Sequence, residues 1–308
     1  MVARKALLLM FFCISIPAGQ SSSKQRPTAD ATAAAPTPAS PGATQGTATC
    51  SLSIVGFEGQ REGIKSASLA CIGGTITVGA HKVLSDFWGP KRKTMPGVVW
   101  DDDHCIERTD CLLTICGRSN AVFNSASITA LRGGGTPTWR MAVCVSQQSS
   151  ITFRQSSFAL IKEATPLVVD DVGTSVLLDH CTIHGNVLTT MPEDYAWTSG
   201  VLASAANLTI VSSTIARNTG VGAAAGAITA TLESHVDIQD TVFSLNVGEY
   251  GAALYADEQS RVGIRDSHFK DNSASQEGGA VYACGQAEVS IESGKRSAGT
   301  SMVTMVQF

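Results

Sequence analysis

Residues 236–246 read Val236-Asp237-Ile238-Gln239-Asp240-Thr241-Val242-Phe243-Ser244-Leu245-Asn246. They follow one order of side-chain types: an apolar residue, any residue, an apolar residue, two polar residues, a small residue, any residue, and then Phe or Ile. Alternation by two places the first two apolar side chains on one face of a short strand, and the polar pair marks a bend. Five further copies of this unit lie elsewhere in the chain, which indicates a repeat architecture.

The six copies align in columns that define the expected core. The residue that ends each unit is always Phe or Ile, at Ile128, Phe158, Ile183, Ile215, Phe243 and Phe269. Five residues earlier the side chain is apolar in every copy, at Phe123, Phe153, Leu178, Ile210, Ile238 and Ile264. One coil cannot bury its own apolar face, whereas stacked coils bury it and pair their strands in parallel. Residues 121–291 therefore predict an all-β fold, a single-stranded parallel β-helix.

Asparagine forms a further column in the later repeats. Three residues after the end of the unit stand Asn186, Asn218, Asn246 and Asn272, where the two earlier copies carry Leu131 and Ile161. Asparagine tolerates left-handed backbone and can hydrogen-bond its own turn, so we expect an amide ladder at one corner. The small residues that follow, such as Gly278 and Gly279, permit a tight corner before the next strand.

These motifs resemble those of a known family. The stretches 243–246 and 269–272, together with Gly278-Gly279-Ala280-Val281, resemble the FxxN and GGA(I/V/L) motifs of the chlamydial polymorphic outer-membrane protein repeat. More broadly, the coils look like the right-handed β-helix repeats of pectin-lyase-like proteins. The resemblance implies a right-handed solenoid. It also implies either an adhesin of the outer membrane or a polysaccharide lyase or glycoside hydrolase.

The N-terminal part has a different composition. Arg4 and Lys5 precede an apolar run over residues 6–16, as in a secretory signal peptide over residues 1–19. That run is too short to cross a bilayer, and no later stretch is long enough, so no transmembrane segment is expected after signal cleavage. Residues 20–49, rich in Ser, Thr, Ala and Pro, predict a disordered linker. Residues 50–120 predict an irregular cysteine-rich cap with early coils, and 292–308 an off-pattern tail.

Cysteine usage agrees with export. The eight cysteines beyond the signal peptide suit disulfides in an oxidising compartment, and six of them lie between Cys50 and Cys144. A zinc site built from Cys105, Cys111, Cys116 and His104 is the alternative, but the spacing matches no CxxC pattern. Cys181 falls in the small column, which favours a buried thiol. We expect no metal and no cofactor.

Only a few polar residues are candidates for chemistry. Asp240 and Asp266 occupy equivalent bend positions on adjacent coils, with Arg265 beside them, and are the best catalytic candidates for an enzyme that cleaves polysaccharide. The same column also holds Gln155, His180 and Ser212, which favours a solvated corner. The stretches 101–104 and 170–171 are interpreted as solvated acidic loops, and His180 with His184 as a surface pair. Asn207-Leu208-Thr209 is an N-glycosylation sequon.

The sequence favours a binding protein. A net charge of −4 with scattered Lys and Arg gives no basic field, so nucleic acid is not an expected partner. We expect a secreted, extracellular or cell-surface structural or adhesin-like protein whose β-helix meets polysaccharide, extracellular matrix or cell-surface components. Outer-membrane association is the alternative location. The alternative functions are a pectin-lyase-like carbohydrate-active enzyme and a fragment of a longer repeat protein.

Overall fold

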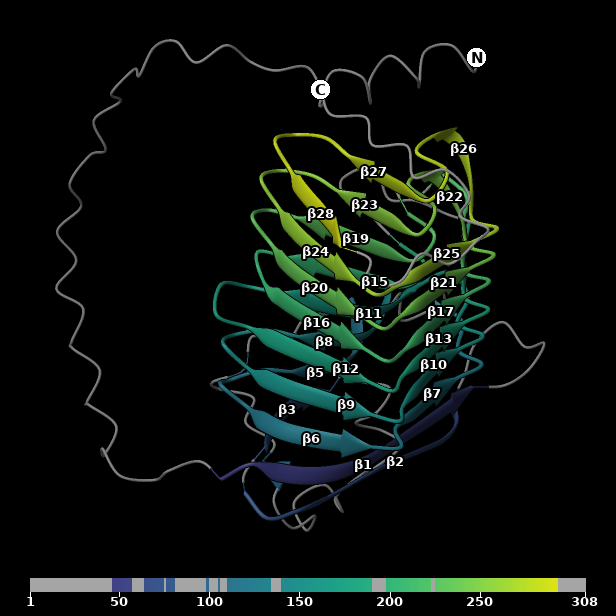
Figure 1. Cartoon of the computed structure of the whole chain (residues 1–308). Coiled ribbons are helices and arrows are strands. Elements are labelled where there is room, and N and C mark those ends of the chain that lie inside the picture. Colours follow the sequence, from purple (N-terminus) through teal and green to yellow (C-terminus); the bar gives the residue numbers. More distant parts are fainter. Residues whose placement is uncertain are drawn as a thin grey trace, which may run out of the picture. The chain divides into compact units, whose positions relative to one another are not determined.

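The computed structural model describes residues 46–56, 64–74, 76–80, 98–99, 105, 110–133, 140–189, 198–222 and 225–292. Within these ranges the chain is all β and contains no helix. Successive coils stack on one another, and each coil contributes strands to the walls of one solenoid (Figure 1). The predicted parallel β-solenoid is therefore confirmed.

The first wall consists of five-residue strands in parallel register. These are β6 (Asn120–Asn124), β9 (Ser150–Arg154), β12 (Ser175–Asp179), β16 (Asn207–Val211), β20 (His235–Gln239), β24 (Arg261–Arg265) and β28 (Glu288–Glu292). The apolar column predicted from the repeats runs through them, because Phe123, Phe153, Leu178, Ile210, Ile238 and Ile264 are cross-strand partners in sequence. All six side chains are buried in the interior of the solenoid.

A bend joins each long strand to a three-residue strand on the second wall. These strands are β7 (Ser127–Thr129), β10 (Ser157–Ala159), β13 (Thr182–His184), β17 (Thr214–Ala216), β21 (Val242–Ser244) and β25 (His268–Lys270). They hold the second apolar column in register from Ile128 to Phe269. Aromatic rings stack along the interior, with ring centroids 5.1 Å apart for Phe123 and Phe153 and 4.9 Å apart for Phe243 and Phe269.

Two further sheets close the coil. One contains β3 (Ile76–Ala80), β4 (Val98–Val99), β5 (Cys111–Ile115), β8 (Met141–Val145), β11 (Thr165–Asp170), β15 (Val201–Ser204), β19 (Ile228–Thr231), β23 (Leu254–Ala256) and β27 (Val281–Ala283). The other contains β14 (Val187–Leu188), β18 (Thr219–Gly220), β22 (Val247–Tyr250) and β26 (Ser273–Glu277). Gly251 and Gly278 explain the small-residue motif between these sheets: both have left-handed backbone, and a Cβ atom on either would collide with the carbonyl of Leu254 or Val281.

Strand β1 (Ala48–Gly56) forms the first layer at the N-terminal end. It pairs in parallel with both β6 and β7, and β2 (Ile64–Ile72) pairs antiparallel with its other edge. The strand begins two residues inside the range expected to be a linker, because Ala48 and Thr49 already pair with Ala121 and Val122. The antiparallel hairpin thus covers the edge that a parallel stack would leave unpaired.

Three disulfides stabilise this N-terminal part. They join Cys50 to Cys71, Cys105 to Cys116, and Cys111 to Cys144. The expected disulfides are confirmed for these six cysteines, and the zinc alternative is wrong, since its three sulfur atoms are all in disulfides; His104 lies outside the described residues. Cys181 and Cys284 form no disulfide and are buried.

The corners contain many left-handed residues that are not glycine. Gln147 and Gln148 both have positive φ, as do Glu258 and Gln259 at the same corner four coils further along the stack. Left-handed backbone costs a residue with a Cβ atom about 1 kcal/mol. The left-handed conformation lets the backbone at this corner keep its hydrogen bonds between coils. The Gln259 N–H, for instance, donates to the carbonyl of Gly285 on the next coil at 2.9 Å.

The largest differences in coil length lie at one corner. The segment from the start of a long strand to the asparagine column has the same length in the repeats 207–218, 235–246 and 261–272. The segment from that column to the next sheet is short between Ile161 and Leu167 and long between Asn186 and Val201. Because Leu167 and Val201 are nevertheless cross-strand partners, this corner absorbs the irregular spacing of the repeats.

Candidate functional site

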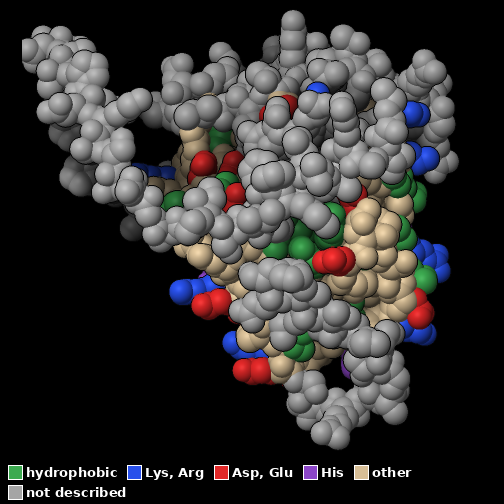
Figure 2. All heavy atoms as spheres, turned by 90° about the horizontal axis from the view of Figure 1, so that it is seen from above, with side chains coloured by type: hydrophobic (Ala, Val, Ile, Leu, Met, Phe, Trp, Pro, Cys, Tyr) green, Lys and Arg blue, Asp and Glu red, His purple; other side chains and the backbone are tan. Residues whose placement is uncertain are grey.

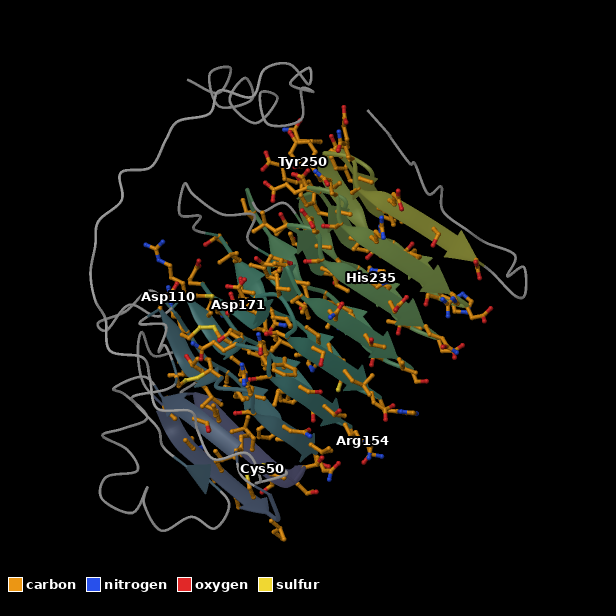
Figure 3. All side chains as sticks on the ribbon, turned by 90° about the vertical axis from the view of Figure 1, so that its left-hand side faces the viewer. Cys50, Asp110, Arg154, Asp171, His235 and Tyr250 are labelled. Atoms are coloured by element: carbon orange, nitrogen blue, oxygen red, sulfur yellow. A yellow bond between two sulfur atoms is a disulfide. The ribbon has the colours of Figure 1, made fainter. Side chains whose placement is uncertain are left out.

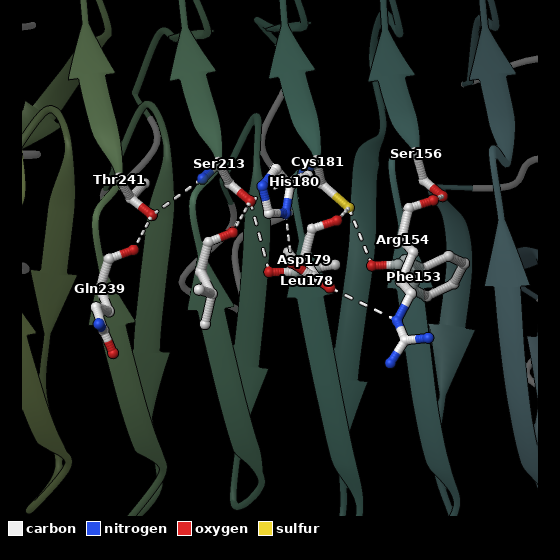
Figure 4. Close-up of polar contacts among 11 residues, drawn as sticks. Phe153, Arg154, Ser156, Leu178, Asp179, His180, Cys181, Ser213, Gln239 and Thr241 are labelled. Atoms are coloured by element: carbon white, nitrogen blue, oxygen red, sulfur yellow. Dashed lines mark hydrogen bonds and ion pairs between the residues drawn. The ribbon is translucent and has the colours of Figure 1, made fainter.

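The exposed and half-buried side chains at the bend between the first and second walls form the candidate site. We call them the bend row. It comprises, coil by coil, Arg154 and Gln155, Asp179 and His180, Val211 and Ser212, Gln239 and Asp240, and Arg265 and Asp266. Figure 4 shows the part of this row from Arg154 to Gln239, together with the buried residues behind it.

The backbone of the bend row turns outward because one residue per coil is left-handed. The φ angles of Gln155, His180, Ser212, Asp240 and Asp266 lie between 47° and 54°. Each of these residues still donates its N–H to the next coil, as from Gln155 to the Asp179 carbonyl at 2.8 Å and from Asp240 to the Arg265 carbonyl at 3.2 Å. The bend is therefore a fixed part of the stack, and its side chains project from a rigid backbone.

A column of small side chains holds the bend from the inside (Figure 4). The Ser213 hydroxyl donates to the Val211 carbonyl at 2.8 Å and accepts the Cys181 N–H at 3.0 Å. The Thr241 hydroxyl makes the same two kinds of bond one coil further on. Because these buried polar atoms satisfy one another, the column is structural.

Cys181 occupies one position of this column. Its thiol lies 3.2 Å from the Phe153 carbonyl and 3.6 Å from the Asp179 carbonyl, in the place that serine fills on the neighbouring coils. Burial raises the pKa of the Cys181 thiol to about 11. The group is therefore a neutral thiol at physiological pH, which argues against a nucleophile.

Arg154, Asp179 and His180 make the best-connected group in the bend row. The Asp179 carboxylate lies 2.6 Å from Nδ1 of His180 and 3.5 Å from Nε of Arg154 on the preceding coil. His180, which the sequence pairs with His184, contacts the adjacent Asp179 in the structure. All three side chains are at least partly exposed, so these ion pairs add little to stability.

Asp240, Asp266 and Arg265 lie in the same row, at the ends of β20 and β24. The Asp240 carboxylate accepts a hydrogen bond from Gln239 at 3.1 Å, and Nε of Arg265 faces the Glu292 carboxylate at 3.9 Å. Both aspartates are exposed, side by side along one edge. Glycoside hydrolysis uses two carboxyl groups that flank the scissile bond, and Asp240 and Asp266 are the two carboxylates that neighbouring coils bring to this row.

A shallow hollow lies at a different corner, between the sheet that contains β5, β8 and β11 and the start of the long strands. It is lined by Gly117, Arg118, Gln147, Gln148, Asp171 and Val172. The Asp171 carboxylate accepts the Gln147 N–H at 3.2 Å, and Nε of Arg118 donates to the Gln148 side chain at 3.1 Å. Figure 3 shows Asp171 near the start of the long strands and Arg154 at their opposite end. The polar groups that line the hollow thus hydrogen-bond one another, and the hollow lies away from the bend row.

The four asparagines lie in one column, in which Asn186, Asn218 and Asn246 are buried and Asn272 is half-buried. The Asn186 side chain donates to Asn218 at 2.9 Å, Asn218 to Asn246 at 3.0 Å, and Asn246 to Asn272 at 3.0 Å. Each also donates to a carbonyl of the preceding coil, as from Asn218 to Ile183 at 3.0 Å. The expected left-handed backbone belongs to the residue before each asparagine, such as Arg217 and Leu245, and the amides bond neighbouring coils and not their own turn.

The surface carries charges of both signs. Figure 2 shows acidic and basic side chains interspersed over the faces that it displays. Among the described residues no group of three or more His, Cys, Asp or Glu side chains could hold a metal ion. The acidic stretch 101–104 lies outside those residues. The described part of the chain also has no helix long and apolar enough to cross a membrane.

Comparisons with known proteins add one finding. A family model described as a right handed beta helix region matches residues 136–295, slightly more than half of the chain. No curated protein and no solved structure matches the chain significantly.

Proposed function

We propose that this chain, which belongs to the right-handed β-helix family, is a secreted, non-enzymatic binding protein that holds extended polysaccharide along its bend row. The observation that carries the proposal is the bend row itself. Polar side chains repeat there once per coil, about 4.8 Å apart, on a backbone fixed from inside by the small column. A preorganised row of this kind loses little entropy when it binds a chain-like ligand.

The chemistry of the row favours a hydroxyl-rich ligand. Arg154 and Gln239 offer N–H donors, and Asp179 and Asp240 offer carboxylate acceptors; Arg154 and Asp179 lie on successive coils, and the coil of Val211 separates Asp179 from Gln239 and Asp240. Sugar hydroxyl groups donate and accept hydrogen bonds, so one polysaccharide chain can meet both kinds of partner. The mixed charge of the row gives no reason to expect a strongly anionic ligand such as nucleic acid.

We further propose that the protein acts at a cell surface or in its surroundings. The resemblance of residues 243–246 and 269–272 to chlamydial polymorphic outer-membrane protein repeats supports an adhesin-like role at a cell surface or in its surroundings. Three disulfides are consistent with an oxidising compartment. Polysaccharide, extracellular matrix and cell-surface glycans are therefore the partners to test first.

The test measures binding and cleavage on the same samples. Purified chain is titrated with a panel of neutral and acidic polysaccharides, and the mixtures are then assayed for new reducing ends and for unsaturated products. We expect binding without products. The Arg154→Ala, Gln239→Ala double variant should weaken binding by about tenfold or more, because two donors of the row are lost.

Arg118→Ala, which removes a donor at the other corner, is the matched control and should bind as the parent chain does. Unchanged binding by the bend-row variant would contradict the proposal. Product formation that disappears in an Asp240→Asn, Asp266→Asn variant would instead establish the alternative, a carbohydrate-active enzyme.

A further inference from the structure

We infer that Asn207 is an N-glycosylation site, so that one oligosaccharide stands on the outer face of the first wall. The inference rests on the export of the chain, which is part of the proposed function. It concerns a different part of the surface from the bend row. The sequence motif, the strand geometry and the surroundings of Asn207 each support it.

Strand geometry places Asn207 and Thr209 of the sequon on the outer face of β16 and Leu208 in the core. Asn207 opens β16 and is exposed, Leu208 is buried in the core, and Thr209 follows on the same outer face as Asn207. A strand places residues two apart on one side, so the amide to be modified and the hydroxyl that the transferase recognises both point outward. Leu208 anchors the segment without covering either side chain.

The surroundings of Asn207 leave room for a glycan. Its cross-strand neighbours are Ser175 and His235, and the Ser175 hydroxyl is bonded to Ser150 at 3.1 Å. Among the described residues, no hydrogen bond to the Asn207 side chain is present. By contrast, Asn120 stands at the same position of β6 and donates its side-chain amide to Thr47 at 3.1 Å.

The sequence makes the site unique. The chain has seven asparagines, and only Asn207 is followed by the x-Ser/Thr pattern. Asn186, Asn218, Asn246 and Asn272 are committed to the buried amide ladder. A modified chain therefore carries one N-linked glycan.

The modification is a transfer from a lipid-diphosphate-linked oligosaccharide. The side-chain nitrogen of Asn207 forms a bond to C1 of the first sugar, and the bond between C1 and the phosphate oxygen breaks. The amide loses one proton to the transferase, and the lipid diphosphate leaves. The sugar replaces one amide hydrogen, so the side chain stays uncharged.

The glycan and the bend row lie at opposite ends of the strand. Asn207 starts β16 and Val211 ends it, which places their Cα atoms about 13 Å apart. We therefore expect the glycan to shield the start of the first wall and to leave the bend row open. Loss of the glycan should change the affinity for polysaccharide by less than about twofold.

The full chain is expressed in a eukaryotic secretory host, and the medium is treated with peptide-N-glycosidase under denaturing conditions. The expected result is one downward step in apparent mass, with Asn207 converted to aspartate in the released peptide. Thr209→Val keeps a β-branched strand residue but lacks the hydroxyl, and it should run at the lower position before treatment. Thr209→Ser restores the hydroxyl and should regain the step.

The outcomes separate the two proposals. Secreted parent chain that shows no step and contains unmodified Asn207 overturns the glycan and leaves the binding function intact. Retention of the chain inside the cell, without a glycan, overturns both the modification and secretion. A step that survives in Thr209→Val also overturns the assignment, because the glycan would then stand elsewhere.

Discussion

The first coils and the later coils of the solenoid are held together by different means. Near the N-terminus, Leu131 and Ile161 occupy the corner column, and covalent bonds tie the layers, as between Cys111 of β5 and Cys144 of β8. From Asn186 onward the same column is a chain of amides, and no disulfide occurs in the described residues there. Disulfides restrict the unfolded chain, whereas the amide ladder acts in the folded one.

The disulfide-linked first coils and the later coils with the asparagine ladder should therefore respond to different perturbations. A reducing agent attacks only the cysteine-linked coils. Substitution of one amide leaves buried groups without partners only in the ladder. Because each coil contacts mainly its neighbours, damage to one half should remain local, and hydrogen exchange is the measurement that can resolve it.

Removal of the disulfide between β5 and β8 should have the largest effect. The bond closes a loop with a sequence separation of 33, and its loss in Cys111→Ala, Cys144→Ala should cost about 4 kcal/mol through the entropy of the unfolded chain. Denaturant unfolding measures the loss. Hydrogen exchange should accelerate in β5 and β8 and stay unchanged in β20 and β24; equal acceleration in all four would contradict the division into halves.

Asn218→Leu should come next, at about 3 kcal/mol, because it leaves the Asn186 N–H and the Ile183 carbonyl buried without these partners. The affected strands should be β13, β17 and β21. The reciprocal change, Ile161→Asn, is the control: it lengthens the ladder by one amide beside Asn186, so it should cost less. A larger loss for Ile161→Asn than for Asn218→Leu would show that the ladder is not what holds the later coils.

Cys181→Ser should have the smallest effect at neutral pH, about 1 kcal/mol or less, because serine fills the same position on neighbouring coils. A pKa of about 11 in the folded state exceeds the ordinary value of 9.0, so the unfolded thiol ionises first as pH rises. The parent chain should therefore lose stability relative to Cys181→Ser between pH 9 and pH 11. Rapid alkylation of Cys181 in the folded chain at pH 8 would contradict this.

Most of the fold follows from the repeats. The two apolar columns gave strand pairs such as Ile210 with Ile238, because side chains that alternate inward in every copy can only stack in one register. The left-handed corners were harder to predict. Gln148, Glu258 and Leu232 carry no sequence signal for positive φ, which the stacking of the coils imposes on them.

The site was only partly predictable. The columns place Asp240 and Asp266 in one row, but their exposure depends on which side of the bend is covered. Arg154 and Asp179 occupy the same column on consecutive coils, and this spacing of opposite charges in the sequence could have predicted their ion pair. The pairing of six cysteines depends on how the cap folds over the first coils, which spacing alone does not determine.

Because the largest length differences lie at one corner, the molecule has a place where residues can be gained or lost. A loop grafted between the asparagine column and the sheet that contains β11 and β15 would leave Leu167 and Val201 paired and the interior unchanged. New recognition segments can therefore evolve at that edge while the scaffold stays the same, and the two properties can diversify independently.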